Sequence, residues 1–290
     1  MKDFAGKVAV VTGAGSGFGR EFARIGAQLG MKLSLADIQP EALAATVDEL
    51  RGQGAQVIGE TVDVSRSADV ERLAQRTLDA YGAVHLLFNN AGVASGGLVW
   101  ENSVKDWEWV LGVNLWGVIH GVRTFVPIML AQGDECHVVN TASVAGLLSP
   151  QLMGVYNVSK HGVVTLTETL YQDLRVTGAR VGVSLLCPAF VPTGIAQSHR
   201  NRPADLHDGS EPTASMIAAQ KASEKAVSSG RISAAEVARM TFDAIRENRF
   251  YVITHPKILA SVELRLQDVI EQRNPSDPFS FKPDVAHRPD

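Results

Sequence analysis

The sequence predicts an α/β fold with a doubly wound, parallel sheet of seven strands and helices on both of its faces. Short apolar runs rich in β-branched residues alternate along most of the chain with longer segments whose apolar residues recur every three or four positions. These are the patterns of buried strands and of amphipathic helices. Their regular alternation favours a parallel sheet in which right-handed crossovers place helices on both sides.

The expected elements follow from these patterns in chain order. The strand pattern occurs at 7–12, 31–36, 55–60, 84–89, 136–141, 180–186 and 250–254. The helix pattern occurs at 18–30, 40–52, 67–81, 103–131, 155–177 and 234–247. Residues 193–231 break the alternation with glycines and prolines among short helical patches, and long excursions after a parallel strand commonly act as lids. We expect one domain over 1–255 that includes this lid, with a helix near 256–272 and a tail, together 256–290, packing on it.

Composition narrows the class of protein. The chain has 290 residues, 45% of them hydrophobic, and a net charge of -4, which gives no electrostatic reason to expect a nucleic acid or an anionic membrane as partner. We expect no membrane span, because no apolar stretch is expected to reach the required length, and the first residues lack a secretory segment, so we expect a cytoplasmic protein. Cys136 and Cys187 lie in strand-like apolar runs and are expected to be buried free thiols; we expect no metal site.

A glycine-rich turn joins the first strand to the first helix. The strand Lys7–Thr12 leads into a turn that contains Gly13, Gly17 and Gly19. Glycines permit a tight turn and a close approach of a pyrophosphate, and the amino terminus of the next helix supplies free N–H groups and a partial positive charge. This context predicts a nucleotide-binding site; a glycine-rich loop without a ligand is the alternative.

The second strand ends at Asp37, and this carboxylate bears on the choice of nucleotide. A carboxylate about 20 residues past the glycine turn can accept hydrogen bonds from the ribose hydroxyls of an adenosine. It would repel a 2′-phosphate, and neither Ser16 nor the neighbours Ile38 and Gln39 supply a positive charge to offset it. NAD(H) is therefore favoured over NADP(H). The alternative is that Asp37 caps the helix that begins near Pro40.

Tyr156 and Lys160 form the most informative pair in the chain. Their spacing of four residues places a phenol and an ammonium side by side on one helix face. A free tyrosine titrates near pH ~10, and lowering this pKa toward ~7 requires about 4 kcal/mol. A buried ammonium together with the positive ring of a bound cofactor could supply that energy. The pair thus predicts a proton-transfer device, although the same spacing also occurs on ordinary solvated helix faces.

The glycine turn, the Tyr-x-x-x-Lys pair and the strand–helix alternation together resemble the short-chain dehydrogenase/reductase family of single-domain type. The resemblance runs from about Lys7 to about Val252 and implies a Rossmann fold. One departure is Pro188-Ala189, where the family often has Pro-Gly. The residues that the resemblance assigns to the cofactor are Gly13, Ser16, Gly17, Phe18, Gly19, Asp37, Ile38, Asp63, Val64, Asn90, Ala91, Gly92, Tyr156, Lys160, Pro188, Val191 and Thr193.

The resemblance also implies a catalytic set: Asn114, Ser143, Tyr156 and Lys160. In it, Tyr156 exchanges a proton with the substrate, Lys160 lowers the pKa of Tyr156 and binds the nicotinamide ribose, and Ser143 donates to the substrate oxygen. Asn114 would anchor a water that links Lys160 to solvent. Two alternatives stay open from the residues alone: Ser143 could cap a helix, and Asn114 could merely bridge two helices.

These features predict reversible hydride transfer between NAD(P) and a hydrophobic secondary alcohol or its ketone. The substrate contacts we expect are Ser143, Val144, Met153, Tyr156, Ala189 and Phe190. Three basic residues of the excursion could meet an anionic tail of the substrate, with a solvated loop face as the alternative: His199, Arg200 and Arg202. Rival functions are a dehydratase or epimerase that uses NAD without net redox change, and a non-catalytic dinucleotide-binding protein. The family usually forms homodimers or homotetramers through the helices at 103–131 and 155–177, and we expect the same here.

Overall fold

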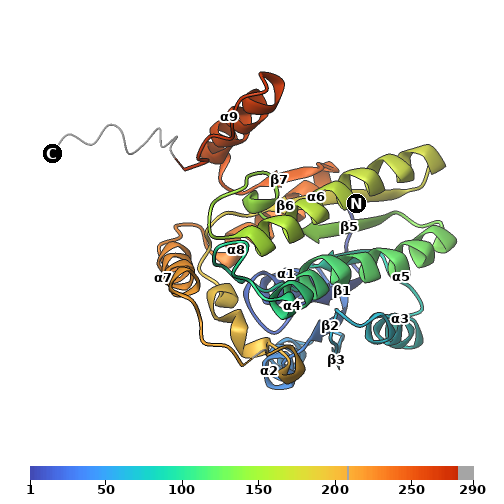
Figure 1. Ribbon diagram of the computed structural model, residues 1–290. Helices are drawn as coiled ribbons and strands as arrows, with labels where there is room; N and C mark the ends of the chain where they lie inside the picture. Colours follow the sequence, from blue (N-terminus) through green and yellow to red (C-terminus); the bar gives the residue numbers. More distant parts are fainter. Residues whose placement is uncertain (208, 280–290) are drawn as a thin grey trace.

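The computed structural model describes residues 1–207 and 209–279, and its centre is one seven-stranded parallel sheet (Figure 1). The strand order is β3-β2-β1-β4-β5-β6-β7, which confirms the predicted doubly wound sheet. The strands are β1 (Val8–Thr12), β2 (Lys32–Asp37), β3 (Val57–Thr61), β4 (Leu86–Asn89), β5 (Cys136–Thr141), β6 (Val181–Cys187) and β7 (Tyr251–Ile253).

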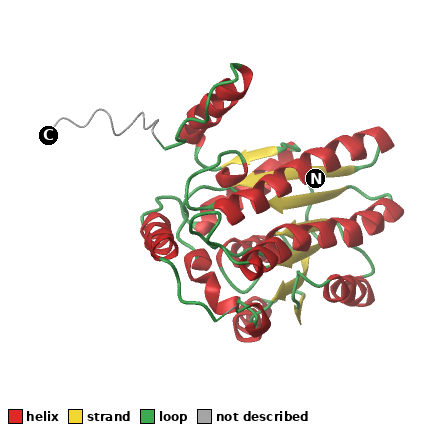
Figure 2. Cartoon of the chain, in the orientation of Figure 1, coloured by secondary structure: helices red, strands yellow, loops and turns green. Residues whose placement is uncertain are grey.

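Helices cover both faces of the sheet (Figure 2). They are α1 (Gly17–Gln28), α2 (Pro40–Gly52), α3 (Ser67–Tyr81), α4 (Val104–Leu111), α5 (Gly117–Gln132), α6 (Gly154–Thr177), α7 (Ala214–Ser228), α8 (Ala234–Glu247) and α9 (Leu259–Ile270). Shorter turns are η1 (Gly112–Trp116), η2 (Val144–Gly146), η3 (Gly194–Asn201), η4 (Ala204–Leu206) and η5 (Pro256–Ile258). Each predicted helix begins and ends within two residues of its prediction, except in the three regions described below.

Two hydrophobic cores hold the helices to the sheet. On one face, Phe88 of β4 lies between Phe22 of α1 and Phe242 of α8, with ring centroids 4.4 and 5.6 Å apart. On the other face, Phe125 and Met129 of α5 pack among the side chains of α3 and α6. Every residue of β1 is buried, because helices cover both of its faces, and this explains its unbroken apolar sequence.

The helix predicted at 103–131 differs from the expectation in its middle. It runs from Val104 to Gln132, but η1 is a π-helical turn that separates α4 from α5. Such turns add one residue to the helix and are frequent at functional sites. By length and apolar composition this helix could also cross a membrane, which inspection of the sequence had not recognised. Here it packs against the sheet, α3 and α6, as a core helix does.

The excursion is more ordered than its sequence indicates. It contains η3 and η4, followed by the fifteen-residue helix α7, where only short helical patches were expected. Thr213 caps α7 by accepting a hydrogen bond from Met216 N–H. The excursion therefore has a defined path, and that path matters for the site below.

The carboxyl-terminal helix was expected to pack on the domain. Helix α9 stands beyond the β7 edge of the sheet, drawn in red in Figure 1, and it contacts chiefly the turn η5 before it. It does not line the main pocket, and Leu259, Leu266, Val269 and Ile270 are exposed. Asp268 fixes the start of the tail by accepting from Ser276 N–H at 2.8 Å. The rest of the predicted tail, 280–290, lies outside the described residues.

Candidate active site

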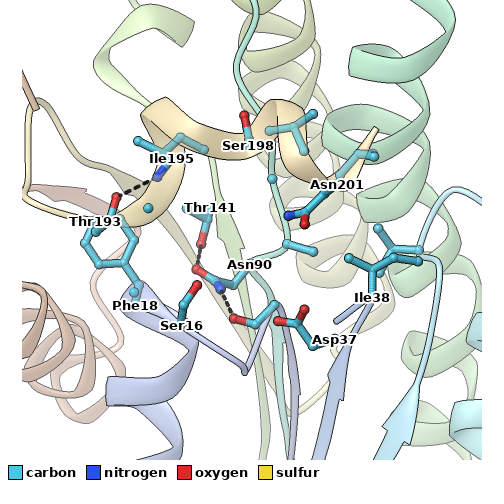
Figure 3. Close-up of a pocket in the computed structure, with 18 of the residues that line it drawn as sticks. Ser16, Phe18, Asp37, Ile38, Asn90, Thr141, Thr193, Ile195, Ser198 and Asn201 are labelled. Carbon is cyan, nitrogen blue, oxygen red and sulfur yellow. Dashed lines mark hydrogen bonds between the residues drawn. The ribbon is translucent and has the colours of Figure 1, made fainter. Parts of the chain in front are cut away.

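The main pocket lies at the carboxyl ends of the strands, where β1 and β4 are neighbours and the strand order reverses. Open α/β sheets bind their ligands at such a switch point. Thr12 and Asn90 join the two strands there: Thr12 Oγ1 accepts from Asn90 N–H at 2.9 Å, and Asn90 Nδ2 donates to Thr12 O at 3.0 Å. Figure 3 shows Asn90 at the floor of the pocket, between Ser16 and Thr141.

The glycine turn has the backbone that a phosphate cradle needs. Gly13 and Gly17 have positive φ angles of 67° and 52°, which disfavour any residue with a side chain. A Cβ on Gly19 would lie 2.0 Å from the carbonyl oxygen of Gly13, so only glycine lets α1 begin this close to β1. The residues present therefore fit a dinucleotide, whose pyrophosphate would meet the amino terminus of α1.

Asp37 is held firmly at the pocket wall. Its Oδ2 accepts from Gly15 N–H at 2.8 Å and its Oδ1 accepts from Gln39 N–H at 2.9 Å. The carboxylate thus bridges the glycine turn and the residue before α2, and it lines the pocket beside Ile38 (Figure 3). Asp37 does not cap α2, whose N-cap is Gln39 without a side-chain cap, so the capping alternative is wrong; the carboxylate orders the backbone before α2 and faces the pocket.

Tyr156 and Lys160 share one face of α6 and both line the pocket. Lys160 is 3% exposed, and its Nζ donates to Thr141 O at 3.0 Å and lies 5.7 Å from the centre of the Tyr156 ring. Burial lowers the pKa of Lys160 to about 8, which still leaves it mostly protonated at neutral pH. A buried positive charge therefore stands beside the phenol, as the spacing of the pair predicts.

Burial also acts on the phenol. It raises the pKa of Tyr156, and the Ser143 hydroxyl opposes this only in part. In the protein alone Tyr156 is therefore a neutral acid at physiological pH. For Tyr156 to act as a base, additional positive charge in the pocket must lower its pKa, and the cationic ring of an oxidised nicotinamide has the required sign.

Ser143 and Asn114 have structural roles as well as candidate chemical ones. Ser143 caps the turn η2 by accepting from Ala145 N–H at 3.1 Å, and its hydroxyl donates to Pro188 O at 3.3 Å. Asn114 lies in the π-helical turn and is fully buried, with its side-chain amide bonded to both backbone groups of Val93 and to Ser159 Oγ. Both alternatives from the sequence, a cap and a bridge, are therefore present.

The structure brings most predicted site residues into one pocket. All the predicted cofactor contacts line it except Gly19, which packs behind the turn. Ser143 and Ala189 line it, whereas Asn114 lies behind its wall. Val144, Met153 and Phe190 do not line it, and their contact with substrate stays a prediction.

The sequence analysis missed the other wall of the pocket. This wall comes from the excursion and from the β4–α4 region: Val93, Trp109, Val113, Ile195, Ser198, Asn201, Pro203, Leu206 and Val227. The excursion was recognisable by its length, but no local pattern shows which of its residues turn toward the strands.

Comparison with known proteins agrees with this geometry. A family model described as short chain dehydrogenase matches residues 7–204. The chain belongs to the short-chain dehydrogenase family. A crystal structure of a short-chain dehydrogenase/reductase from Burkholderia phymatum, in complex with NAD, is 62% identical, with a TM-score of 0.95 and coverage of 97% of this chain and 100% of that one.

Two curated relatives are also similar. The CLA biosynthesis dehydrogenase/reductase of Lactiplantibacillus plantarum is 33% identical over 95% of this chain and 97% of its own. The cyclohexanol dehydrogenase of an Acinetobacter species is 35% identical over 66% of this chain and 75% of its own.

Proposed function

We propose that the protein interconverts a hydrophobic secondary alcohol and its ketone with NAD(H) as hydride carrier. The observation that carries this proposal is the convergence of Tyr156, Lys160 and Ser143 in the pocket that also holds the glycine turn and Asp37. The 62% identical relative with bound NAD and the relative named for cyclohexanol support the choice of cofactor and of substrate class.

The chain's own residues bind the cofactor at several points. The N–H groups at the start of α1 would hold the pyrophosphate, Asp37 the adenosine ribose and Lys160 the nicotinamide ribose. When bound, the nicotinamide accepts or supplies the hydride. The protein contributes placement, a dry environment and control of the proton.

Tyr156 moves that proton. In oxidation its phenolate takes the proton of the substrate hydroxyl, and in reduction its phenol returns one to the carbonyl oxygen. The protonated Lys160 stabilises the phenolate, since its charge lies close to the ring in a buried site where charges interact strongly. The Ser143 hydroxyl, now on Pro188 O through a long bond of 3.3 Å, can turn to the substrate oxygen as charge develops there.

The pocket around Tyr156 favours an apolar substrate. The pocket lining includes the apolar residues Ala142, Ala189, Val191 and Val93. The arginines that could meet an anionic substrate already have partners: Arg200 lines the pocket but donates to carbonyls of its own loop, and Arg202 pairs with Asp106. Nonpolar burial would thus supply most of the affinity, with Ser143 and Tyr156 fixing orientation.

A panel of aliphatic, alicyclic and aryl secondary alcohols, assayed for NADH formation by absorbance at about 340 nm, tests this function. We expect turnover with apolar alcohols and a loss of at least about 10²-fold in Tyr156→Phe, because the proton acceptor is removed. A preference for charged hydroxy acids would contradict the substrate class. Substrate conversion without any NADH signal would favour a dehydratase or epimerase, and a fully active Tyr156→Phe would mean that another group moves the proton.

We also propose a homodimer or homotetramer. Trp116 and Val104 on the α4–α5 helix are 50% and 72% exposed, which is costly for large apolar side chains on the surface of a monomer. Light scattering coupled to gel filtration measures the mass directly; a monomer at micromolar concentration would contradict the proposal.

A further inference from the structure

The first part of the excursion, residues 194–206, runs along the whole length of the pocket, and we call this segment the strap. It begins beside Thr193 and Phe18 at one end and reaches Asp37 and Ile38 at the other (Figure 3). Figure 3 shows the Asn201 side chain turned from the strap toward the pocket, and Ile195 and Ser198 also belong to the pocket lining. The strap thus forms a wall opposite the carboxyl ends of the strands, rather than a flap over the Tyr156 end alone.

Four contacts hold the strap in place, and one of them is the hydrogen bond that Gln220 Nε2 of α7 donates to Ala196 O at 2.6 Å. At its middle, Ser198 Oγ accepts from Ala94 N–H at 2.8 Å and donates to Ala94 O at 3.2 Å. At its far end, the side chain of Asn201 accepts a hydrogen bond from the side chain of Gln39, on the loop before α2. One residue further, Arg202 pairs with Asp106 of α4 at 2.6 Å.

The Arg202–Asp106 pair has the features of an anchor. The side chains are only 14% and 8% exposed, and the guanidinium lies 5.3 Å from the ring centre of Trp109, which itself lines the pocket. Asp106 is fixed in turn by the capping box of α4, where its Oδ2 accepts from Ser103 N–H and Oγ–H. Loss of one partner would leave the other buried and unpaired, so the two groups hold each other strongly.

The anchored end of the strap lies at the adenosine side of the pocket. Gln39 follows Asp37 by two residues, and Asp37 is the group that would bind the adenosine ribose. Asn201 Oδ1 is occupied by Gln39, whereas its two amide N–H groups have no acceptor within 1–207 and 209–279. In Figure 3 this amide faces the pocket. It can therefore donate to a ligand that carries acceptors near Asp37.

We propose that the strap binds the adenosine half of the dinucleotide, with Asn201 as a cofactor-binding residue and the Arg202–Asp106 pair as the positioning anchor. This inference rests on the proposed function. It changes the role of the excursion: the segment 194–206 retains the cofactor, and the dinucleotide leaves only when the strap lifts from Ala94, Gln39 and α4.

Binding of NADH and of ADP-ribose, which lacks the nicotinamide, tests the inference without any alcohol. NADH affinity and release are followed by its fluorescence in equilibrium and stopped-flow experiments, and ADP-ribose by competition. In Asn201→Ala we expect both ligands to bind about 3- to 10-fold more weakly, because one typical hydrogen bond is lost. The weaker binding should appear as faster dissociation of the ligand, with little change in the association rate. The matched control is Gln75→Ala, which removes a side-chain hydrogen bond to Asp79 on the exposed face of α3, away from the pocket lining; its ADP-ribose affinity should be unchanged.

The anchor is tested as a pair, so that no buried charge is left alone. In the double variant Asp106→Asn with Arg202→Met, we expect faster NADH release by about 10-fold or more, with the thermal unfolding temperature recording any general loss of stability. Equal effects of Asn201→Ala and Gln75→Ala on ADP-ribose, or no effect of Asn201→Ala, would overturn the proposal. Wild-type protein that bound neither NADH nor ADP-ribose would instead overturn the proposed function, and the inference with it.

Discussion

Replacement of Asp37 by serine tests the electrostatic basis of cofactor choice. In the wild type the carboxylate is fixed by Gly15 and Gln39 N–H groups, so it cannot turn away from a 2′-phosphate. Two unit charges ~4 Å apart repel by about 1 kcal/mol in water and about 4 kcal/mol near a protein surface. A phosphate carries more than one charge at neutral pH.

The size of the effect follows from these values. Asp37 is half-buried, which places the repulsion between the two limits, at about 2–4 kcal/mol. A hydrogen bond from the ribose hydroxyl to the charged carboxylate adds about 1.5–3 kcal/mol in favour of NAD. Wild-type protein should therefore prefer NAD over NADP by about 10³- to 10⁵-fold in kcat/KM.

In Asp37→Ser both terms are lost, so we expect kcat/KM to fall with NAD and rise with NADP, and the ratio of the two to drop by about 10²-fold or more. The assay is kcat/KM for both cofactors at low and at high salt. Because salt screens the repulsion, the wild-type preference should shrink as salt rises, and that of the variant should not.

The control is Asp48→Ser on the exposed side of α2, which makes the same change in net charge away from the pocket. Its preference should equal that of the wild type. If Asp37→Ser kept the wild-type ratio of cofactors, or if Asp48→Ser changed it equally, the reasoning from the local carboxylate would be refuted.

Two further predictions concern α6. Oxidation requires the Tyr156 phenolate, so kcat/KM for oxidation should rise with pH through the pKa of Tyr156 in the cofactor complex. Over the same pH range, kcat/KM for reduction should fall, because reduction requires the protonated phenol. In Lys160→Met the neighbouring charge is lost, so both the rising and the falling limb of these pH profiles should move to higher pH. Thr167→Val should lower the free energy of unfolding by about 1–3 kcal/mol in urea titrations, because the buried Asn140 Nδ2 loses the acceptor that it has at 3.0 Å. Thr177→Val, at the exposed end of the same helix, should change it by less than about 0.5 kcal/mol.

Each of these has an outcome that would contradict it. A Lys160→Met profile with its limbs at the wild-type pH would mean that the ammonium does not act on the Tyr156 pKa. Equal stability losses in Thr167→Val and Thr177→Val would mean that the buried link from the sheet to α6 contributes nothing beyond an ordinary helix position.

That link is a tertiary contact, whereas the face that Tyr156 and Lys160 share follows from the local sequence. Asn89 Nδ2 donates to Asn140 Oδ1 at 2.9 Å, and Asn140 Nδ2 donates to Thr167 Oγ1 at 3.0 Å, so β4, β5 and α6 are joined through their buried polar groups. The spacing of Tyr156 and Lys160 fixes their common face, since one helical turn is a property of the backbone. Only the fold, however, supplies the Thr141 carbonyl to Lys160.

The sequence by itself determined the order of strands and helices, the glycine turn, Asp37 at the end of β2 and the Tyr156–Lys160 face, because each depends on residues close together in the chain. The tertiary structure decided the π-helical turn around Asn114, the burial that raises the pKa of Tyr156, and the course of the strap from Thr193 to Asp106. Those features depend on contacts between residues up to 162 positions apart, as between Gln39 and Asn201, and no periodicity within a segment encodes such a contact.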